Sequence, residues 1–88
     1  MSRYVYTLHA EDKFKLPEIK KLRITKKKVE DTIENPLALD KSEKPVYIAV
    51  SKLSGNLSLC VAHRKDGRDT RIITFFPAEK GRYERKIL

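Results

Sequence analysis

The sequence has few of the residues that cross-link or interrupt a small fold. Its 88 residues include one cysteine, three glycines, one methionine and no tryptophan. The single cysteine, Cys60, cannot form an internal disulfide, and we expect it to be a small buried side chain in a strand. Paired Cys/His metal motifs, a glycine-rich phosphate loop and a serine triad are also missing from the sequence. These absences disfavour the commoner metal-dependent, nucleotide-binding and serine-hydrolase classes, and we predict no metal and no cofactor.

Long apolar runs are missing as well. No stretch approaches the ~18 residues that cross a bilayer, and the N-terminus lacks the apolar core of a signal peptide. We therefore predict a cytoplasmic protein with no membrane partner. Charged residues form 36% of the chain and hydrophobic residues 40%. This composition is typical of a globular protein, and the length fits a single domain over residues 1–88.

Negative charge is scarce relative to positive charge. The 12 Asp and Glu residues stand against 20 Lys and Arg, which gives a formal net charge of +8. A small domain with this charge attracts polyanions or an acidic protein, and a lysine-rich surface that only keeps the protein soluble is the alternative. Three of the lysines, residues 26–28, stand where a helix is expected to begin, which is the unfavourable end of the helix dipole for a cation.

Other cations gather around one expected hairpin and in the C-terminal residues after it. They are Arg64, Lys65, Arg68, Arg71, Lys80, Arg82, Arg85 and Lys86. Together they predict one continuous basic surface that binds nucleic acid through phosphate contacts, with an affinity that falls steeply as salt rises. Few aromatic residues lie between them, so specific recognition of single-stranded bases is not indicated.

The most apolar stretch is residues 71–77, which is rich in β-branched and aromatic residues and stops at a proline. It predicts a strand. Strict alternation places Ile72 and Phe76 on one face and Ile73 and Phe75 on the other. A strand that is apolar on both faces is usually internal in its sheet, and we predict that position for this one.

The remaining pattern predicts an α+β fold. We expect strands over residues 3–8, 46–50 and 57–63, a tight hairpin at 65–68, and a loop at 37–45. A helical stretch begins at His9 and is broken or kinked at Pro17, and a second helix is capped by Thr25 and ends at Asn35. The element order predicts a four-stranded, mainly antiparallel sheet in the order 1-4-3-2, with two helices packed on one face.

Three phrases of the sequence resemble the RelE/ParE toxin superfamily, in particular its small BrnT-like and uncharacterised relatives. They are His9-Ala10 at the start of the first helix, residues 24–36 ending in Asn-Pro, and residues 72–77 at the end of the last strand. The segment at residues 14–17 departs from the usual pattern. The resemblance implies a RelE-like fold and a toxin of a type II toxin–antitoxin pair. Many such toxins cut RNA without a metal, often messenger RNA on the ribosome, whereas others inhibit gyrase and some show no toxicity.

Metal-free RNA cleavage needs a base for the 2′-hydroxyl proton, cations around the phosphate and a proton donor for the leaving oxygen. We predict Arg71 as the phosphate-binding group and His63 as the acid–base group, close together across the hairpin. Tyr83 is predicted to stack on a base or position a phosphate, and Lys52 is a weaker candidate because it falls at the opposite end of the sheet.

Each candidate has a structural alternative. His63 is then a surface residue, Arg71 pairs with Asp66 or Asp69, and Tyr83 anchors the C-terminal segment. His9 is interpreted as a helix-start residue packed against the sheet.

The sequence thus predicts a toxin-like domain that acts as a metal-independent ribonuclease on messenger RNA and is neutralised by an acidic antitoxin. The alternatives are a non-catalytic basic module that binds nucleic acid or an acidic partner, and a gyrase-inhibiting ParE-like toxin.

Overall fold

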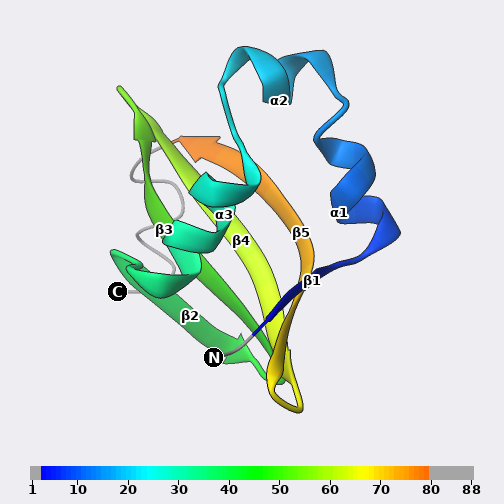
Figure 1. Cartoon of the computed structure of the whole chain (residues 1–88). Coiled ribbons are helices and arrows are strands. Elements are labelled where there is room, and N and C mark those ends of the chain that lie inside the picture. Colours follow the sequence, from blue (N-terminus) through cyan, green and yellow to red (C-terminus); the bar gives the residue numbers. More distant parts are fainter. Residues whose placement is uncertain (1–2, 80–88) are drawn as a thin grey trace.

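The computed structural model of the chain describes residues 3–79. Three short helices and five strands follow one another along the chain (Figure 1). In order they are β1 (Tyr4–Tyr6), α1 (Leu8–Lys13), α2 (Pro17–Lys21), α3 (Lys26–Glu34), β2 (Ala38–Glu43), β3 (Val46–Ser54), β4 (Leu57–Asp66) and β5 (Asp69–Glu79). None of these helices is long and apolar enough to span a membrane.

The strands form one mixed sheet in the order β1-β5-β4-β3-β2. β1 runs parallel to β5, and the other neighbouring pairs are antiparallel. The four predicted strands correspond to β1, β3, β4 and β5 and stand in the predicted order, with β5 internal between β1 and β4. The α+β class is confirmed.

The expected loop at 37–45 is wrong, because Ala38–Glu43 within it form the edge strand β2. Its residues have weak strand propensity and mostly point to solvent. The strand exists because its backbone pairs with β3, where Leu39 lies opposite Ala49. Pairing partners of this kind cannot be inferred from the local pattern.

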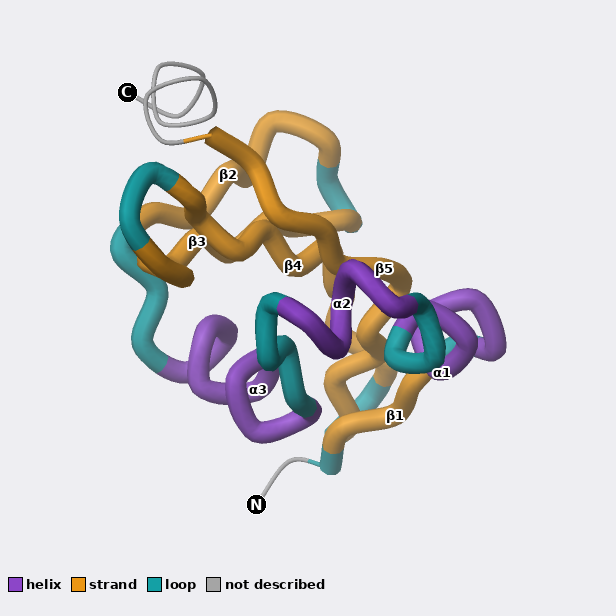
Figure 2. Tube along the Cα trace, turned by 90° about the horizontal axis from the view of Figure 1, so that it is seen from above, coloured by secondary structure: helices purple, strands orange, loops and turns teal. Residues whose placement is uncertain are grey.

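The helical layer contains three helices rather than two. Pro17 stands at the start of α2, where its missing N–H is not needed, so it begins a helix rather than kinking one. Thr25 caps α3 as predicted, accepting a hydrogen bond from the Lys28 N–H at 3.2 Å. All three helices contribute to one core with the sheet, and Figure 2 shows them gathered beside it.

The core joins three helical residues and one residue of the loop between α2 and α3 to four sheet residues: Ala10, Ile19, Val29 and the loop residue Ile24 with Leu59, Val61, Ile72 and Phe75. Phe75 is its largest fully buried side chain. The Phe14 ring packs on Phe75 at 4.6 Å between centroids, and Tyr6 meets Phe14 at 5.8 Å. These aromatic contacts tie α1 and β1 to β5.

The predicted faces of β5 are wrong, because a β-bulge interrupts its alternation. Ala62 pairs with Thr74 and His63 pairs with Ile72, so Ile73 has no residue opposite it on β4. One extra residue reverses the faces beyond it. Ile72 and Phe75 therefore share the core under the helices, where strict alternation would have placed Ile72 with Phe76.

Phe75→Ala tests this inversion. We expect a loss of about 3–5 kcal/mol in the free energy of unfolding, because a buried ring is replaced by a cavity. The control is Leu8→Ala, since Leu8 is 84% exposed and surface truncations usually change stability by less than about 0.5 kcal/mol. Urea denaturation followed by circular dichroism measures both, and equal effects from the two variants would contradict the burial of Phe75.

Candidate functional site

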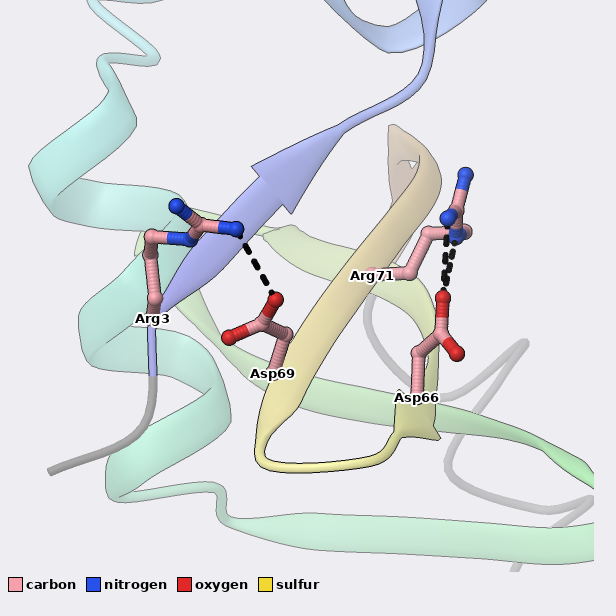
Figure 3. Close-up of polar contacts among 4 residues, drawn as sticks. All are labelled: Arg3, Asp66, Asp69 and Arg71. Atoms are coloured by element: carbon pink, nitrogen blue, oxygen red, sulfur yellow. Dashed lines mark hydrogen bonds and ion pairs between the residues drawn. The ribbon is translucent and has the colours of Figure 1, made fainter.

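Both aspartates of the hairpin pair with an arginine, one from the hairpin itself and one from the residue before β1 (Figure 3). Arg71 donates to one Asp66 carboxylate oxygen from Nη2 at 2.8 Å and from Nε at 3.2 Å. Arg3 donates to Asp69 at 3.1 Å. The hydrogen bond and the charge of Arg71 lower the pKa of Asp66. The structural alternative for Arg71, a pair with Asp66, is therefore what the fold contains.

His63 and Arg71 do not converge. His63 lies opposite Ile72 in the β4–β5 ladder, and its side chain is only 6% exposed. Its Nδ1 lies 3.1 Å from the Val61 carbonyl oxygen, and burial lowers the pKa of the imidazole. Arg71 directly precedes Ile72 on β5 and pairs with Arg64. Because neighbouring residues of a strand point to opposite faces, the Arg71 side chain lies on the face opposite to that of His63. The two residues lie one register step apart across the hairpin, as predicted, but their side chains point to opposite faces, and His63 is a buried packing residue rather than a surface one.

Lys52 lies at the far end of the sheet, as expected from its position before the β3–β4 turn. That turn and the β4–β5 hairpin stand at opposite ends of β4, which has ten residues, or about 30 Å of extended chain. The Lys52 carbonyl accepts a hydrogen bond from Lys28 Nζ at 2.9 Å. Lys52 therefore lies near the start of α3 and far from the hairpin.

The remaining predicted residues divide into two groups. Arg64, Lys65 and Arg68 are exposed at the hairpin, and Lys65 Nζ donates to Thr70 Oγ1 at 3.3 Å. The others, Tyr83, Lys80, Arg82 and Arg85, lie outside the described residues.

A denser basic region lies at the opposite end of the sheet from the hairpin. Residues 15–28 contain seven Lys and Arg against one acidic residue, Glu18. The hairpin segment 64–71 contains four cations against two aspartates. Figure 1 shows α2 at the upper end of the molecule and the hairpin at the lower end. Counting charge along 15–28 would have found this region, of which the sequence analysis noted only residues 26–28.

Most cations of this region are not neutralised. Lys15 pairs with Asp12 at 3.7 Å and Lys26 with Glu11 at 2.9 Å. Within residues 3–79 no ion pair involves the four exposed cations Lys20, Lys21, Arg23 and Lys27. We call these four residues the basic end. Lys20 and Lys21 face solvent because α2 buries only Ile19, and Arg23 and Lys27 are exposed in the segment that follows.

A second polar cluster lies where α1 meets β5. His9 Nε2 is 3.1 Å from Thr74 Oγ1, and Lys13 Nζ is 3.4 Å from the same oxygen. The two groups extend from neighbouring turns of one face of α1, four residues apart. They border a hollow of about 210 Å³ whose other lining residues are Asp12 and Leu16. His9 was expected to pack against the sheet, and its imidazole contacts the sheet through the hydroxyl of Thr74 on β5.

The bulge and one threonine place this cluster. Thr7 N–H donates to the Ile72 carbonyl at 3.1 Å, and Thr7 Oγ1 donates to the Ile73 carbonyl at 2.8 Å. The same Thr7 oxygen accepts from Ala10 N–H at 3.1 Å and caps α1. The first turn of α1 is thereby fixed to the bulge, beside Thr74.

The Lys13 ammonium is partly withdrawn from water. Its Nζ lies 5.5 Å from the centroid of the Phe75 ring and 6.0 Å from that of Phe76. Burial lowers the pKa of Lys13, since a low-dielectric surrounding disfavours the charged form. The cluster therefore holds one imidazole, one hydroxyl and one partly desolvated ammonium.

No protein-family model matches the chain, and searches of curated proteins and of solved structures also give no match. Residues 3–79 contain no group of three His, Cys, Asp or Glu side chains arranged to hold a metal ion. The two basic regions and the His9 cluster are therefore the features of the described residues that bear on function.

The buried state of His63 is testable by proton NMR. Burial places its folded pKa below the ordinary value of about 6.5, so the unfolded chain binds the proton more tightly. The free energy of unfolding should then fall as pH drops below about 6.5, and the loss should be complete once pH is below the folded pKa. The imidazole resonance of His63, assigned with His9→Gln, should titrate with a midpoint below 6.5; a midpoint at or above that value would contradict its burial.

Proposed function

We propose that the protein binds RNA through the basic end, as a toxin-like protein of the kind that the sequence resemblance implies. The observation that carries the proposal is the group of four exposed cations, Lys20, Lys21, Arg23 and Lys27, without an acidic partner among residues 3–79. Such a group attracts a polyanion because its charge is not balanced locally.

The expected contacts are with phosphates rather than bases. The basic end contains no aromatic side chain on which a base can stack, and its lysines act as point charges. Phosphate contacts supply affinity and orientation but carry no sequence information. We therefore expect binding with little sequence preference and a strong dependence on salt.

The geometry supports binding better than cleavage by the predicted set. His63 is buried and Arg71 is paired with Asp66 on the other face, so they do not meet at one phosphate. Lys52 lies at the opposite end of β4. The hairpin remains a second, weaker basic surface.

An antitoxin fits the same proposal as a competitor. An acidic protein segment that covers Lys20, Lys21, Arg23 and Lys27 would neutralise the charge that RNA needs. RNA binding and antitoxin binding would then exclude each other.

Two matched charge reversals test the proposal. The variant K20E/K21E/K27E changes the basic end, and R64E/K65E/R68E makes the same change in net charge at the hairpin. We expect the first to weaken binding of a 20-nucleotide RNA by at least ~100-fold, and the second by less than ~10-fold. Fluorescence anisotropy at several salt concentrations measures this, and four phosphate contacts predict a slope of about −3 in log K against log salt for the unmodified protein.

The comparison also defines the failures. Equal losses in both variants would show that only net charge matters, and a larger loss in the hairpin variant would restore the predicted hairpin surface. Duplex DNA of the same length is the second ligand, and tighter binding to it than to RNA would overturn the choice of RNA. Circular dichroism confirms that each variant is folded.

A further inference from the structure

The chain leaves α2 through a residue with left-handed backbone. Arg23 has a φ of 58° and is the one non-glycine residue with a positive φ among residues 3–79. The other two positions with a positive φ in this part of the chain, 55 and 67, are occupied by glycine. A residue with a Cβ is disfavoured in this conformation because the Cβ crowds a backbone carbonyl oxygen. We therefore expect the arginine at position 23 to make the fold less stable than a glycine would.

The end of α2 fixes this conformation. Ile24 N–H donates to the Ile19 carbonyl at 3.2 Å, and Arg23 N–H donates to the Lys20 carbonyl at 3.0 Å. This pair of bonds is the Schellman motif, in which the first residue after the cap is left-handed and is usually glycine. Ile19 and Ile24 are both buried in the core. The turn therefore cannot relax to a right-handed conformation unless Ile24 leaves the core.

The side chain of Arg23 makes no polar contact that offsets this strain. It is exposed, and within residues 3–79 its guanidinium takes part in no hydrogen bond or ion pair. The dipole of α2 favours a cation near its last turn, but this helix has five residues and already ends with Lys20 and Lys21. A residue that breaks a local rule without an internal gain is expected at a functional position.

We propose that Arg23 is the orienting contact of the basic end and binds the two non-bridging oxygens of one RNA phosphodiester. The inference rests on the proposed RNA binding and deepens it by assigning the residue that positions the polyanion. Arg23 is the one arginine of the basic end. Its planar guanidinium presents parallel N–H donors that match two oxygens of one phosphate, whereas the lysines act as point charges.

Arg23 also stands centrally among the four cations along the chain. Lys20 and Lys21 precede it in the last turn of α2, and Lys27 follows it in the first turn of α3. Residues 22–25 join the two helices (Figure 1). A phosphate bound at Arg23 leaves the neighbouring phosphates of the same strand for the lysines of the two helices. The RNA backbone is then fixed at one phosphate and attracted without fixed geometry at the others.

Arg23→Gly should separate stability from binding, because it removes the backbone strain together with the guanidinium. In the full-length protein we expect its thermal unfolding midpoint to rise by about 3–6 °C. Its affinity for a 20-nucleotide RNA should fall by at least ~10-fold, and the slope of log K against log salt should become shallower by about 0.7. Lys21→Gly removes the same charge from a helical position, so its unfolding midpoint should fall instead.

Arg23→Lys tests the planar guanidinium itself. This variant keeps the charge and the left-handed backbone but loses the two parallel donors, so RNA affinity should fall by at least ~5-fold while the unfolding midpoint stays within about 2 °C. Arg3→Lys is the matched control, because Arg3 pairs with Asp69 at the other end of the molecule. It should leave RNA affinity unchanged within ~2-fold. Fluorescence anisotropy measures the affinities, and circular dichroism measures the unfolding midpoints.

The outcomes distinguish this inference from the RNA-binding proposal. Unchanged RNA affinity in Arg23→Lys overturns the bidentate contact and leaves binding by net charge intact. A lower unfolding midpoint in Arg23→Gly overturns the inference as well, since the arginine would then be present because it stabilises the fold. Absence of RNA binding by the unmodified protein overturns both the RNA-binding proposal and the inference that rests on it.

Discussion

The bulge at Ile73 is the constraint on which the arrangement of the molecule depends. One residue without a partner on β4 shifts the faces of β5, so that Ile72 and Phe75 both enter the core. The Ile73 carbonyl is at the same time the acceptor for Thr7 Oγ1, which caps α1. A single irregularity therefore determines both the core packing of β5 and the position of the first helix.

Helix α3 is held against β1 by a different kind of contact. The Tyr6 hydroxyl donates to Glu30 at 2.6 Å, and the Tyr4 hydroxyl donates to Glu34. Burial and the neighbouring carboxylates raise the pKa of both phenols, so the hydroxyls remain donors. Two acidic residues of α3 are thereby engaged, one at the middle of the helix and one at its last position.

This placement leaves the charge of α3 uneven. Its first turn contains no acidic residue and carries lysines 26–28, against the preference of the helix dipole. The local cost of such cations is small, about a few tenths of a kcal/mol each, and packing of Val29 in the core exceeds it. The fold therefore tolerates the three lysines at the start of α3, beside α2. As a result, the end of the sheet near α2 carries more positive charge than the hairpin end.

The sequence predicted those parts of the fold that local pattern controls. Strong apolar strands, the Asp66-Gly67 hairpin and the Thr25 cap all follow from residue type and spacing, and they are present. β2 was missed because its residues have no strand pattern and depend on pairing with β3. The bulge was missed because nothing in the Ile-Ile-Thr run marks which residue will lack a partner.

The difference between local pattern and long-range pairing also explains which parts of the candidate site could be predicted. Charge in residues 15–28 is visible in the sequence, so the basic end was within reach of prediction. The relation of His63 to Arg71 depends on register, and one step of register places a side chain on the opposite face. The contact between His9 and Thr74 joins residues 65 positions apart and needed both the cap and the bulge to be known.

The short length of β1 determines how α1 reaches the edge of β5. β1 pairs with β5 only at residues 70–72, and Thr7 then leaves the sheet to cap α1. Among the described residues, no strand continues along β5 beyond this point, so α1 takes the place that a longer strand would fill. Side chains from a helix can reach a strand hydroxyl at such an edge, whereas a paired strand would occupy that space with its own backbone. The same early departure that shortens the parallel pair therefore brings an imidazole and an ammonium to Thr74.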